Sequence, residues 1–326
     1  MATKSLVSGI IIFLNCEKYI EEAIASVFTQ TYPHWELLLV DDGSTDGSTA
    51  IAQRYAQQYP EQVFYLEHAG HQNRGMSASR NLGIAHARGD YLAFLDADDV
   101  WLPQKLEQQL NLFQHYPEAG VVCGPTLWWY SWTGHPYHQA LDAMREMNRE
   151  YDRLFQPPTL LKQLLLDQAR TPATCSVLIK RELLRETGGF EEEFRALYED
   201  QAFFAKVYLK AKVYISSQHW DLYRQHSENC CVVADKTGQG TPGLLNPAHQ
   251  RLLQWLEQYL LAENVQDAEL IKLLSTALWA YDHPQLYYML HPERLARIIG
   301  RALLPTQWRE WLWNRYMTIK GMSLNG

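Results

Sequence analysis

The chain has 326 residues, 47% of them hydrophobic, and a formal net charge of −8. This length predicts one domain of about 230 residues with an appendage, and the acidic balance argues against nucleic acid as a main partner. No stretch approaches the 18 or so consecutive apolar residues that a membrane span needs. Five cysteines without a C-x-x-C pair are typical of reduced thiols. We therefore expect a cytoplasmic protein, either free or peripheral at the inner face of the membrane.

The first hundred residues alternate between strand-like and helix-like patterns. Apolar runs at residues 6–14, 36–40 and 63–67 predict strands. Apolar residues recur at helical spacing in residues 20–28, after the first run, and a second helix is predicted at residues 49–59, after the second run. Strands that alternate with helices predict an α/β fold, with a mixed and mainly parallel sheet flanked by helices.

A polar turn follows the second predicted strand and begins with Asp41 and Asp42. Residues 41–48 contain three acids, two glycines and three hydroxyl side chains, a composition that suits a turn leading into a helix. Capping of that helix accounts for Asp46 or Ser48. It does not account for an acidic pair at the end of a buried strand, although a purely structural turn remains the alternative.

Residues 73–85 predict a glycine-bearing loop that enters a helix. The N–H groups at the start of such a helix, together with Arg80, would suit an anion such as a diphosphate. The alternative is an ordinary helix start, with Arg80 facing water or paired with an acid.

The apolar run at residues 91–95 predicts a strand buried on both faces, and it ends in Asp96, Asp98 and Asp99. In an open α/β sheet ligands bind at the carboxyl ends of the parallel strands, where carboxylates can hold a divalent cation against a phosphate. The alternative is a solvated turn in which Asp99 precedes the helix predicted at residues 103–115.

The middle of the chain is less regular. We predict strands at residues 119–123 and 174–179, with a loop or mobile helix over the site up to about residue 156. The aromatic stretch at residues 126–132 could line an acceptor groove, but core or interface packing is the favoured interpretation. A helix at residues 202–209, opened by residues 198–201, precedes two short strands at residues 213–216 and 220–223.

We expect residues 1–230 to form the main domain, and residues 231–326 to form a flexible loop and a helical C-terminal extension. The loop is predicted at residues 232–247, followed by helical apolar spacing that includes Leu252, Leu256 and Leu260 and later Leu295 and Ile299. A last helix at residues 307–320 combines Trp with Arg and Lys. Docking onto the chain or onto a second subunit is favoured for it over peripheral membrane contact.

Taken together, these motifs resemble the family 2 glycosyltransferases of the GT-A fold, over about residues 6–226. The resemblance is carried by Asn15, by the turn at residues 41–46, by residues 73–83 with Ser77 and Arg80, and by residues 95–99. Four motifs in the expected order are far more specific than any one of them.

The resemblance implies a role for each matching residue. Asn15, Asp41, Asp42, Arg80, Asp96 and Asp98 would bind the nucleotide sugar, with Asp41 or Asp42 at the base and Asp96 at the ribose. Asp98 would bind Mn²⁺ or Mg²⁺, and His226 could complete the metal site. Asp200 would be the catalytic base, which a position at a helix N-terminus would help to keep ionised.

The predicted function is an inverting glycosyltransferase that moves a sugar from a nucleotide-diphosphate donor, with UDP favoured, to an acceptor hydroxyl. A glycan or lipid-linked acceptor in cell-surface glycan or glycolipid synthesis is expected. One alternative is a non-catalytic nucleotide-sugar-binding partner protein. A sugar nucleotidyltransferase is the weaker alternative, because residues 15–19 lack its glycine-rich phosphate loop.

Overall fold

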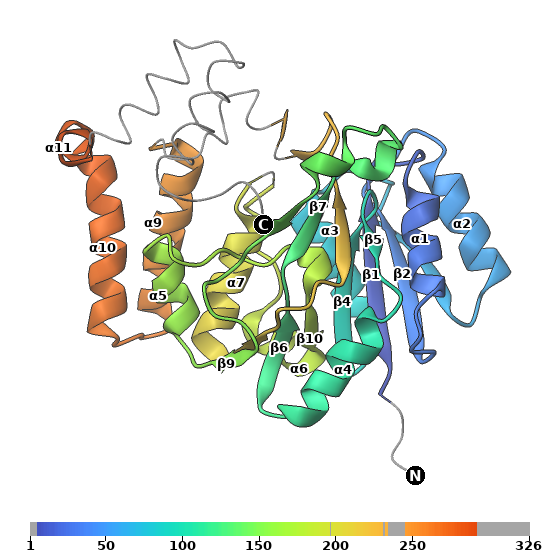
Figure 1. Ribbon diagram of the computed structural model, residues 1–326, viewed down its shortest axis with the longest axis horizontal. Helices are drawn as coiled ribbons and strands as arrows, with labels where there is room; N and C mark the ends of the chain where they lie inside the picture. Colours follow the sequence, from blue (N-terminus) through green and yellow to red (C-terminus); the bar gives the residue numbers. More distant parts are fainter. Residues whose placement is uncertain (1–4, 196, 231, 234–244, 292–326) are drawn as a thin grey trace.

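A computed structural model describes residues 5–195, 197–230, 232–233 and 245–291 (Figure 1). The first part of the chain alternates strands and helices as predicted. Its elements are β1 (Val7–Phe13), α1 (Ile20–Phe28), β2 (Trp35–Asp41), α2 (Ser48–Gln58), β3 (Val63–Glu67), α3 (Met76–His86), β4 (Tyr91–Asp96), β5 (Val100–Trp101), α4 (Lys105–His115), β6 (Ala119–Cys123) and β7 (Thr126–Trp129).

The second part contains shorter elements and then a group of helices. Short 3₁₀ turns lie at Ser131–Thr133, Gln139–Leu141 and Thr174–Ser176. The remaining elements are β8 (Ala143–Arg145), β9 (Arg153–Phe155), α5 (Thr159–Leu165), β10 (Leu178–Lys180), α6 (Arg181–Thr187), α7 (Glu199–Lys210), β11 (Lys212–Ile215), β12 (Asp221–Arg224), α9 (Pro247–Ala262), α10 (Ala268–Asp282) and α11 (Pro284–Leu290).

The main sheet has eight strands in the order β3-β2-β1-β4-β10-β6-β11-β9. Strands β1 to β4 are mutually parallel, β6 pairs parallel with β11, and β10 and β9 run antiparallel to their neighbours. This arrangement confirms the predicted mixed, mainly parallel α/β sheet. Because β10 is antiparallel to both β4 and β6, the strands β1, β2, β4, β6 and β11 all end at the same edge.

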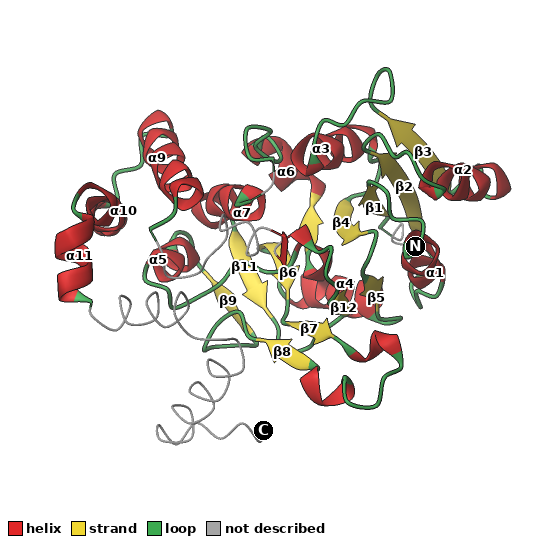
Figure 2. Ribbon diagram, turned by 90° about the horizontal axis from the view of Figure 1, so that it is seen from above, coloured by secondary structure: helices red, strands yellow, loops and turns green. Residues whose placement is uncertain are grey.

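A second, four-stranded sheet in the order β5-β12-β7-β8 lies beside the carboxyl end of β4 (Figure 2). Strand β12 pairs antiparallel with β5, which directly follows the acidic end of β4, and parallel with β7. This pairing brings the chain near residue 226 back to the acids at residues 96–99.

Helices cover both faces of the main sheet because alternate residues of each strand point to opposite faces. Ile10 and Ile12 belong to the core cluster that includes residues of α3, α6 and α7. Ile11 and Phe13 belong to the cluster that includes residues of α1 and α4. Burial on both faces explains why these strands are continuous apolar runs.

The C-terminal helices α9 to α11 form a group beside α5 and α7 (Figure 1). Leu252, Leu253, Leu256 and Leu260 of α9 are buried, as their spacing predicts. Leu295, Ile299 and the helix predicted at residues 307–320 lie outside the described residues, as does most of the loop predicted at residues 232–247. None of the helices within the described ranges is both long and apolar enough to span a membrane.

Several predictions for the middle of the chain were wrong. The stretch before residue 156 contains strands β8 and β9 and two 3₁₀ turns instead of a loop or mobile helix. The predicted strand at residues 174–179 begins as a 3₁₀ turn, and α5 and α6 were not predicted. Three- and seven-residue elements carry too few residues to show a period, and β8 and β9 are stabilised by pairing with β7 and β11, which are distant in sequence.

Helix α3 lies so close to β1 that Gly83 has no room for a side chain. A Cβ atom on Gly83 would lie 2.6 Å from Cγ2 of Ile10. We predict that Gly83→Ala lowers the free energy of unfolding by roughly 1–3 kcal/mol, although alanine is the better helix former. Urea denaturation measures this effect. In an Ile10→Ala background the same change should cost much less, and equal costs in both backgrounds would contradict the assigned contact.

Candidate functional site

Polar side chains converge at the carboxyl ends of β1, β2 and β4. In the sheet register Asp41 pairs with Phe13, and Asp96 pairs with Ile12. The two acid-bearing strands therefore flank the end of β1, as the sequence predicts for one ligand site at this edge.

The loop after β1 is attached to the turn after β2. Asn15 has a left-handed backbone, with φ of 54°, and its Oδ1 accepts a hydrogen bond from the Thr45 N–H at 2.7 Å. The Cys16 N–H donates to Ser48 Oγ at 2.8 Å. Asn15 thus joins the two loops, and it is also exposed at the edge where a nucleotide would bind.

Asp41 and Asp42 shape the loops around them. Both oxygens of Asp41, which is fully buried, accept hydrogen bonds, from the Ser44 N–H at 2.7 Å and from Thr49 Oγ1 at 2.5 Å. Asp42 accepts from the Arg74 N–H at 2.8 Å and from Ser79 Oγ at 3.0 Å, so it fixes the loop that leads into α3. A contact of either carboxylate with a base stays a prediction.

Arg80 joins two groups of carboxylates. Its side chain is 2% exposed, and Nη2 donates to Asp96 Oδ1 at 2.8 Å while Nη1 lies 3.6 Å from Glu199 Oε1. Burial alone would lower the pKa of the guanidinium, but Asp96 and Glu199 outweigh it and raise the pKa. Arg80 therefore pairs with acids, and its predicted contact with a diphosphate stays a prediction. Glu199 was not singled out in the sequence.

Asp98 and His226 meet at the site although they are far apart in the chain. His226 Nε2 lies 3.0 Å from Asp98 Oδ2, and its Nδ1 accepts from the Glu228 N–H at 3.3 Å. No group of three or more potential His, Cys, Asp or Glu ligands occurs among the residues the structure describes. Mg²⁺ is often held by only one or two carboxylates together with substrate phosphates, carboxylate oxygens also suit Mn²⁺, and a neutral imidazole is a common metal ligand. The two residues therefore fit a divalent ion that shares its other ligands with a bound diphosphate.

Asp99 is fully buried and holds the backbone of a neighbouring strand. Its Oδ1 accepts from the backbone N–H of Arg224 at 2.9 Å, and burial, with the charges of Asp98 and Asp96, raises its pKa well above the usual value. Arg224 Nε donates to the Asp98 carbonyl at 2.6 Å, and its guanidinium stacks on Trp129 and Trp132. Part of the aromatic stretch thus packs on a buried arginine, in agreement with the favoured interpretation.

Asp200 lies in the first turn of α7 next to Glu199. Its Oδ2 accepts from Thr171 Oγ1 at 3.1 Å and its Oδ1 from the Gln201 N–H at 2.7 Å. Burial raises the pKa of Asp200 in spite of these hydrogen bonds. Burial, and then the charge of Asp200, raise the pKa of Glu199 to about 7. The effect of burial therefore exceeds the helix-end stabilisation that the sequence predicts for an ionised Asp200.

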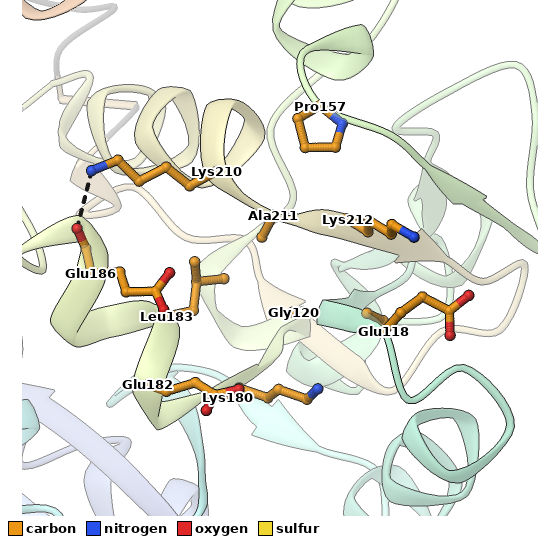
Figure 3. Close-up of a pocket in the computed structure, with 11 residues that line it drawn as sticks. Glu118, Gly120, Pro157, Lys180, Glu182, Leu183, Glu186, Lys210, Ala211 and Lys212 are labelled. Atoms are coloured by element: carbon orange, nitrogen blue, oxygen red, sulfur yellow. Dashed lines mark hydrogen bonds between the residues drawn. The ribbon is translucent and has the colours of Figure 1, made fainter. Parts of the chain in front are cut away.

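A separate hollow of about 320 Å³ lies at the opposite edge of the sheet, near the starts of β6 and β11 (Figure 3). Lysines and glutamates line it in similar numbers. Lys210 Nζ donates to the Glu186 carbonyl at 3.1 Å, and Lys180 Nζ donates to the Pro117 carbonyl at 2.6 Å. The hollow is remote from the acids at residues 96–99.

The family model described as "Glycosyl transferase family 2" matches residues 8–188, more than half of the chain. The chain belongs to this family. The match contains Asn15, Arg80 and the acids at residues 41–42 and 96–98, and it ends before Asp200 and His226.

Similar curated proteins point to the same family. TuaG of Bacillus subtilis, whose name assigns it to teichuronic acid biosynthesis, is 46% identical over 126 residues, which are 38% of this chain and 48% of that protein. EpsE of Bacillus subtilis is 40% identical over 118 residues, which are 35% of this chain and 42% of that protein. The chain thus spans less than half the length of these two relatives.

Solved structures confirm the GT-A fold predicted from the resemblance. TarS 1-349 of S. aureus in complex with UDP-GlcNAc matches with a TM-score of 0.62 and 17% identity, over 93% of this chain and 77% of that chain. The mannosyltransferase PcManGT from Pyrobaculum calidifontis, in complex with GDP-Man and Mn²⁺, matches with a TM-score of 0.54 and 18% identity. The match covers 95% of this chain and 84% of that chain. At this identity the likeness concerns the fold.

The raised pKa of Glu199 predicts a pH-dependent stability. The native state keeps the Glu199 proton up to about pH 7, whereas the unfolded state loses it near the ordinary glutamate pKa of 4.5. Between these values the native state binds more protons, so its stability falls as the pH rises. Relative to Glu199→Gln, the wild type should lose roughly 1–3 kcal/mol of unfolding free energy from pH 4.5 to 7.5. Urea denaturation across this range measures it.

Glu193→Gln provides the matched control, because Glu193 is an exposed glutamate six residues away. Its stability profile should run parallel to that of the wild type. A Glu199→Gln profile that also runs parallel to the wild type would show that Glu199 titrates normally.

Proposed function

We propose that this chain is a metal-dependent, inverting glycosyltransferase that uses a nucleotide-diphosphate sugar as donor. The observation that carries the proposal is the position of Arg80. Its guanidinium contacts Asp96, on the side where the donor would bind, and Glu199, next to the candidate base. Membership of glycosyl transferase family 2 supports the same function.

The donor would bind at the ends of β1, β2 and β4. Asp98 and His226 would hold a Mn²⁺ or Mg²⁺ ion, which when bound would offset the charge that grows on the leaving diphosphate. Asp96, with its side chain 30% exposed, remains accessible to a ribose. Asn15 and the loops shaped by Asp41 and Asp42 would form the wall against the base.

Asp200 would act as the general base. The acceptor hydroxyl oxygen forms a bond to the anomeric carbon as the bond from that carbon to the diphosphate oxygen breaks, and the hydroxyl proton passes to Asp200. A pKa raised by burial makes the carboxylate a stronger base than an exposed aspartate. With one base and no assigned nucleophile, a single displacement with inversion at the anomeric carbon is expected.

Uridine is the favoured donor base, and a cell-surface glycan is the favoured acceptor. A structural neighbour, TarS 1-349, was solved with UDP-GlcNAc. TuaG and GgaB of Bacillus subtilis carry names that assign them to teichuronic acid and minor teichoic acid biosynthesis; GgaB is 34% identical over 52% of this chain and 18% of its own length. These relatives support a hydroxyl-rich glycan acceptor.

The donor base and the metal requirement are tested together by thermal shift. UDP, GDP, CDP and dTDP are each added with and without Mn²⁺ to the wild type and to Asp98→Asn. A ligand at about 100 times its dissociation constant adds roughly 2.7 kcal/mol of stability, so a metal-dependent rise in Tm is expected for UDP. The rise should be lost in the variant. No shift with any nucleotide would contradict donor binding and favour a non-catalytic role.

The role of Asp200 is tested by Asp200→Asn, which keeps the side-chain volume but removes the base. Donor turnover, measured as release of the nucleoside diphosphate, should fall roughly 10²- to 10⁴-fold. The nucleotide-induced rise in Tm should stay unchanged. Asp167→Asn, at an exposed aspartate, serves as the control and should leave turnover unaffected. Turnover near the wild-type level in Asp200→Asn would exclude Asp200 as the base.

A further inference from the structure

Tyr198, directly before Glu199 and Asp200, has an unusual backbone conformation. Its φ is 68°, in the left-handed region that residues other than glycine adopt uncommonly. Helix α7 begins at Glu199, so the backbone at Tyr198 sets the direction in which the first turn of α7 leaves the preceding loop. Whatever fixes Tyr198 therefore also fixes where the two carboxylates point.

The C-terminal helix α9 contacts the Tyr198 side chain at two points. The Tyr198 hydroxyl accepts a hydrogen bond from Asn246 Nδ2 at 3.1 Å. The Tyr198 ring lies 5.5 Å from the ring of His249, between centroids. The same ring packs against a small apolar cluster of Phe194, Ala202 and Leu252.

Asn246 is itself held in one orientation. It is the N-cap of α9, and its Oδ1 accepts from the His249 N–H at 2.7 Å. Its Nδ2 is thereby directed to Tyr198. His249 is fixed in turn, because its Nδ1 lies 2.6 Å from the hydroxyl of Tyr281 on α10. Two helices that follow the main domain in sequence thus hold the residue that precedes the candidate base.

We propose that Asn246 is a positioning residue for the Glu199–Asp200 pair and acts through Tyr198. The inference rests on the proposed function, in which Asp200 is the base. It assigns a catalytic contribution to the C-terminal helices, which lie outside the part of the chain matched by the family model. A purely structural Asn246 would affect the stability of α9 alone.

The geometric part of the inference is tested without any substrate, by hydrogen exchange on the full chain. Asn246→Ser keeps a side-chain oxygen for the cap, but serine is too short to reach Tyr198. The amides of residues 198–203 should exchange roughly 3- to 10-fold faster, because the loss of one hydrogen bond frees the first turn of α7.

Asp267→Ser is the matched control. Asp267 is the N-cap of the neighbouring helix α10, and its side chain accepts from the Leu270 N–H at 2.9 Å. This variant should change exchange in α10 and leave residues 198–203 unaffected. Unchanged exchange at residues 198–203 in Asn246→Ser would overturn the inference.

The catalytic part is tested with a double-mutant cycle of Asn246→Ser and Tyr198→Phe. Either change removes the same hydrogen bond, so each should lower kcat for release of the nucleoside diphosphate roughly 3- to 10-fold. The double variant should be no slower than the slower single variant. KM for the donor should stay unchanged, since neither residue lies at the donor side of the site.

The outcomes separate the inference from the proposed function. A wild type that turns over its donor, with single variants as fast as the wild type or with additive losses in the double variant, overturns the inference alone. A wild type without turnover on any nucleotide sugar overturns the proposed function, and with it the catalytic role of Asn246. The exchange experiment still reports whether α9 orders the first turn of α7.

Discussion

The site depends on the ion pairs that the buried guanidinium of Arg80 forms with Asp96 and Glu199. Removing a charge from water costs several kcal/mol per ion unless partners compensate, and here the compensation comes from two separate elements. Asp96 stands at the end of β4, and Glu199 stands at the start of α7. Arg80 Nε and Nη1 have no hydrogen-bond partner within the described ranges, so the compensation is mainly electrostatic. One arginine thereby fixes α3, β4 and α7 relative to one another.

The crowding of carboxylates around Arg80 also bears on their pKa values. Asp96, Glu199 and Asp200 together carry three negative charges when ionised, against one guanidinium. Burial raises the pKa values of both Glu199 and Asp200, and the charge of Asp200 raises that of Glu199 further, whereas the charge of Arg80 lowers both. A carboxylate with a raised pKa can take a proton from a hydroxyl more readily than an exposed one, so the burial of these carboxylates also favours the role proposed for Asp200.

The sequence predicted the main strands, the first four helices and the edge at which the acids meet, because long apolar runs and strand-end acids are local patterns. It also predicted the meeting of Asp98 and His226, through the family resemblance. It could not show that Asp41 and Asp99 are buried, since that depends on which backbone N–H groups the folded turns present to each oxygen. Glu199 was overlooked for the same reason: its importance arises from the approach of Arg80 across the fold.

The two halves of the site come from different parts of the chain, and they are built differently. The proposed donor side lies on loops at the ends of parallel strands, where the buried sheet fixes each position. The candidate base lies on α7, whose first turn follows a left-handed residue and touches Thr171 and α9. A helix start outside the sheet needs outside contacts to hold its direction, and the described C-terminal helices supply them.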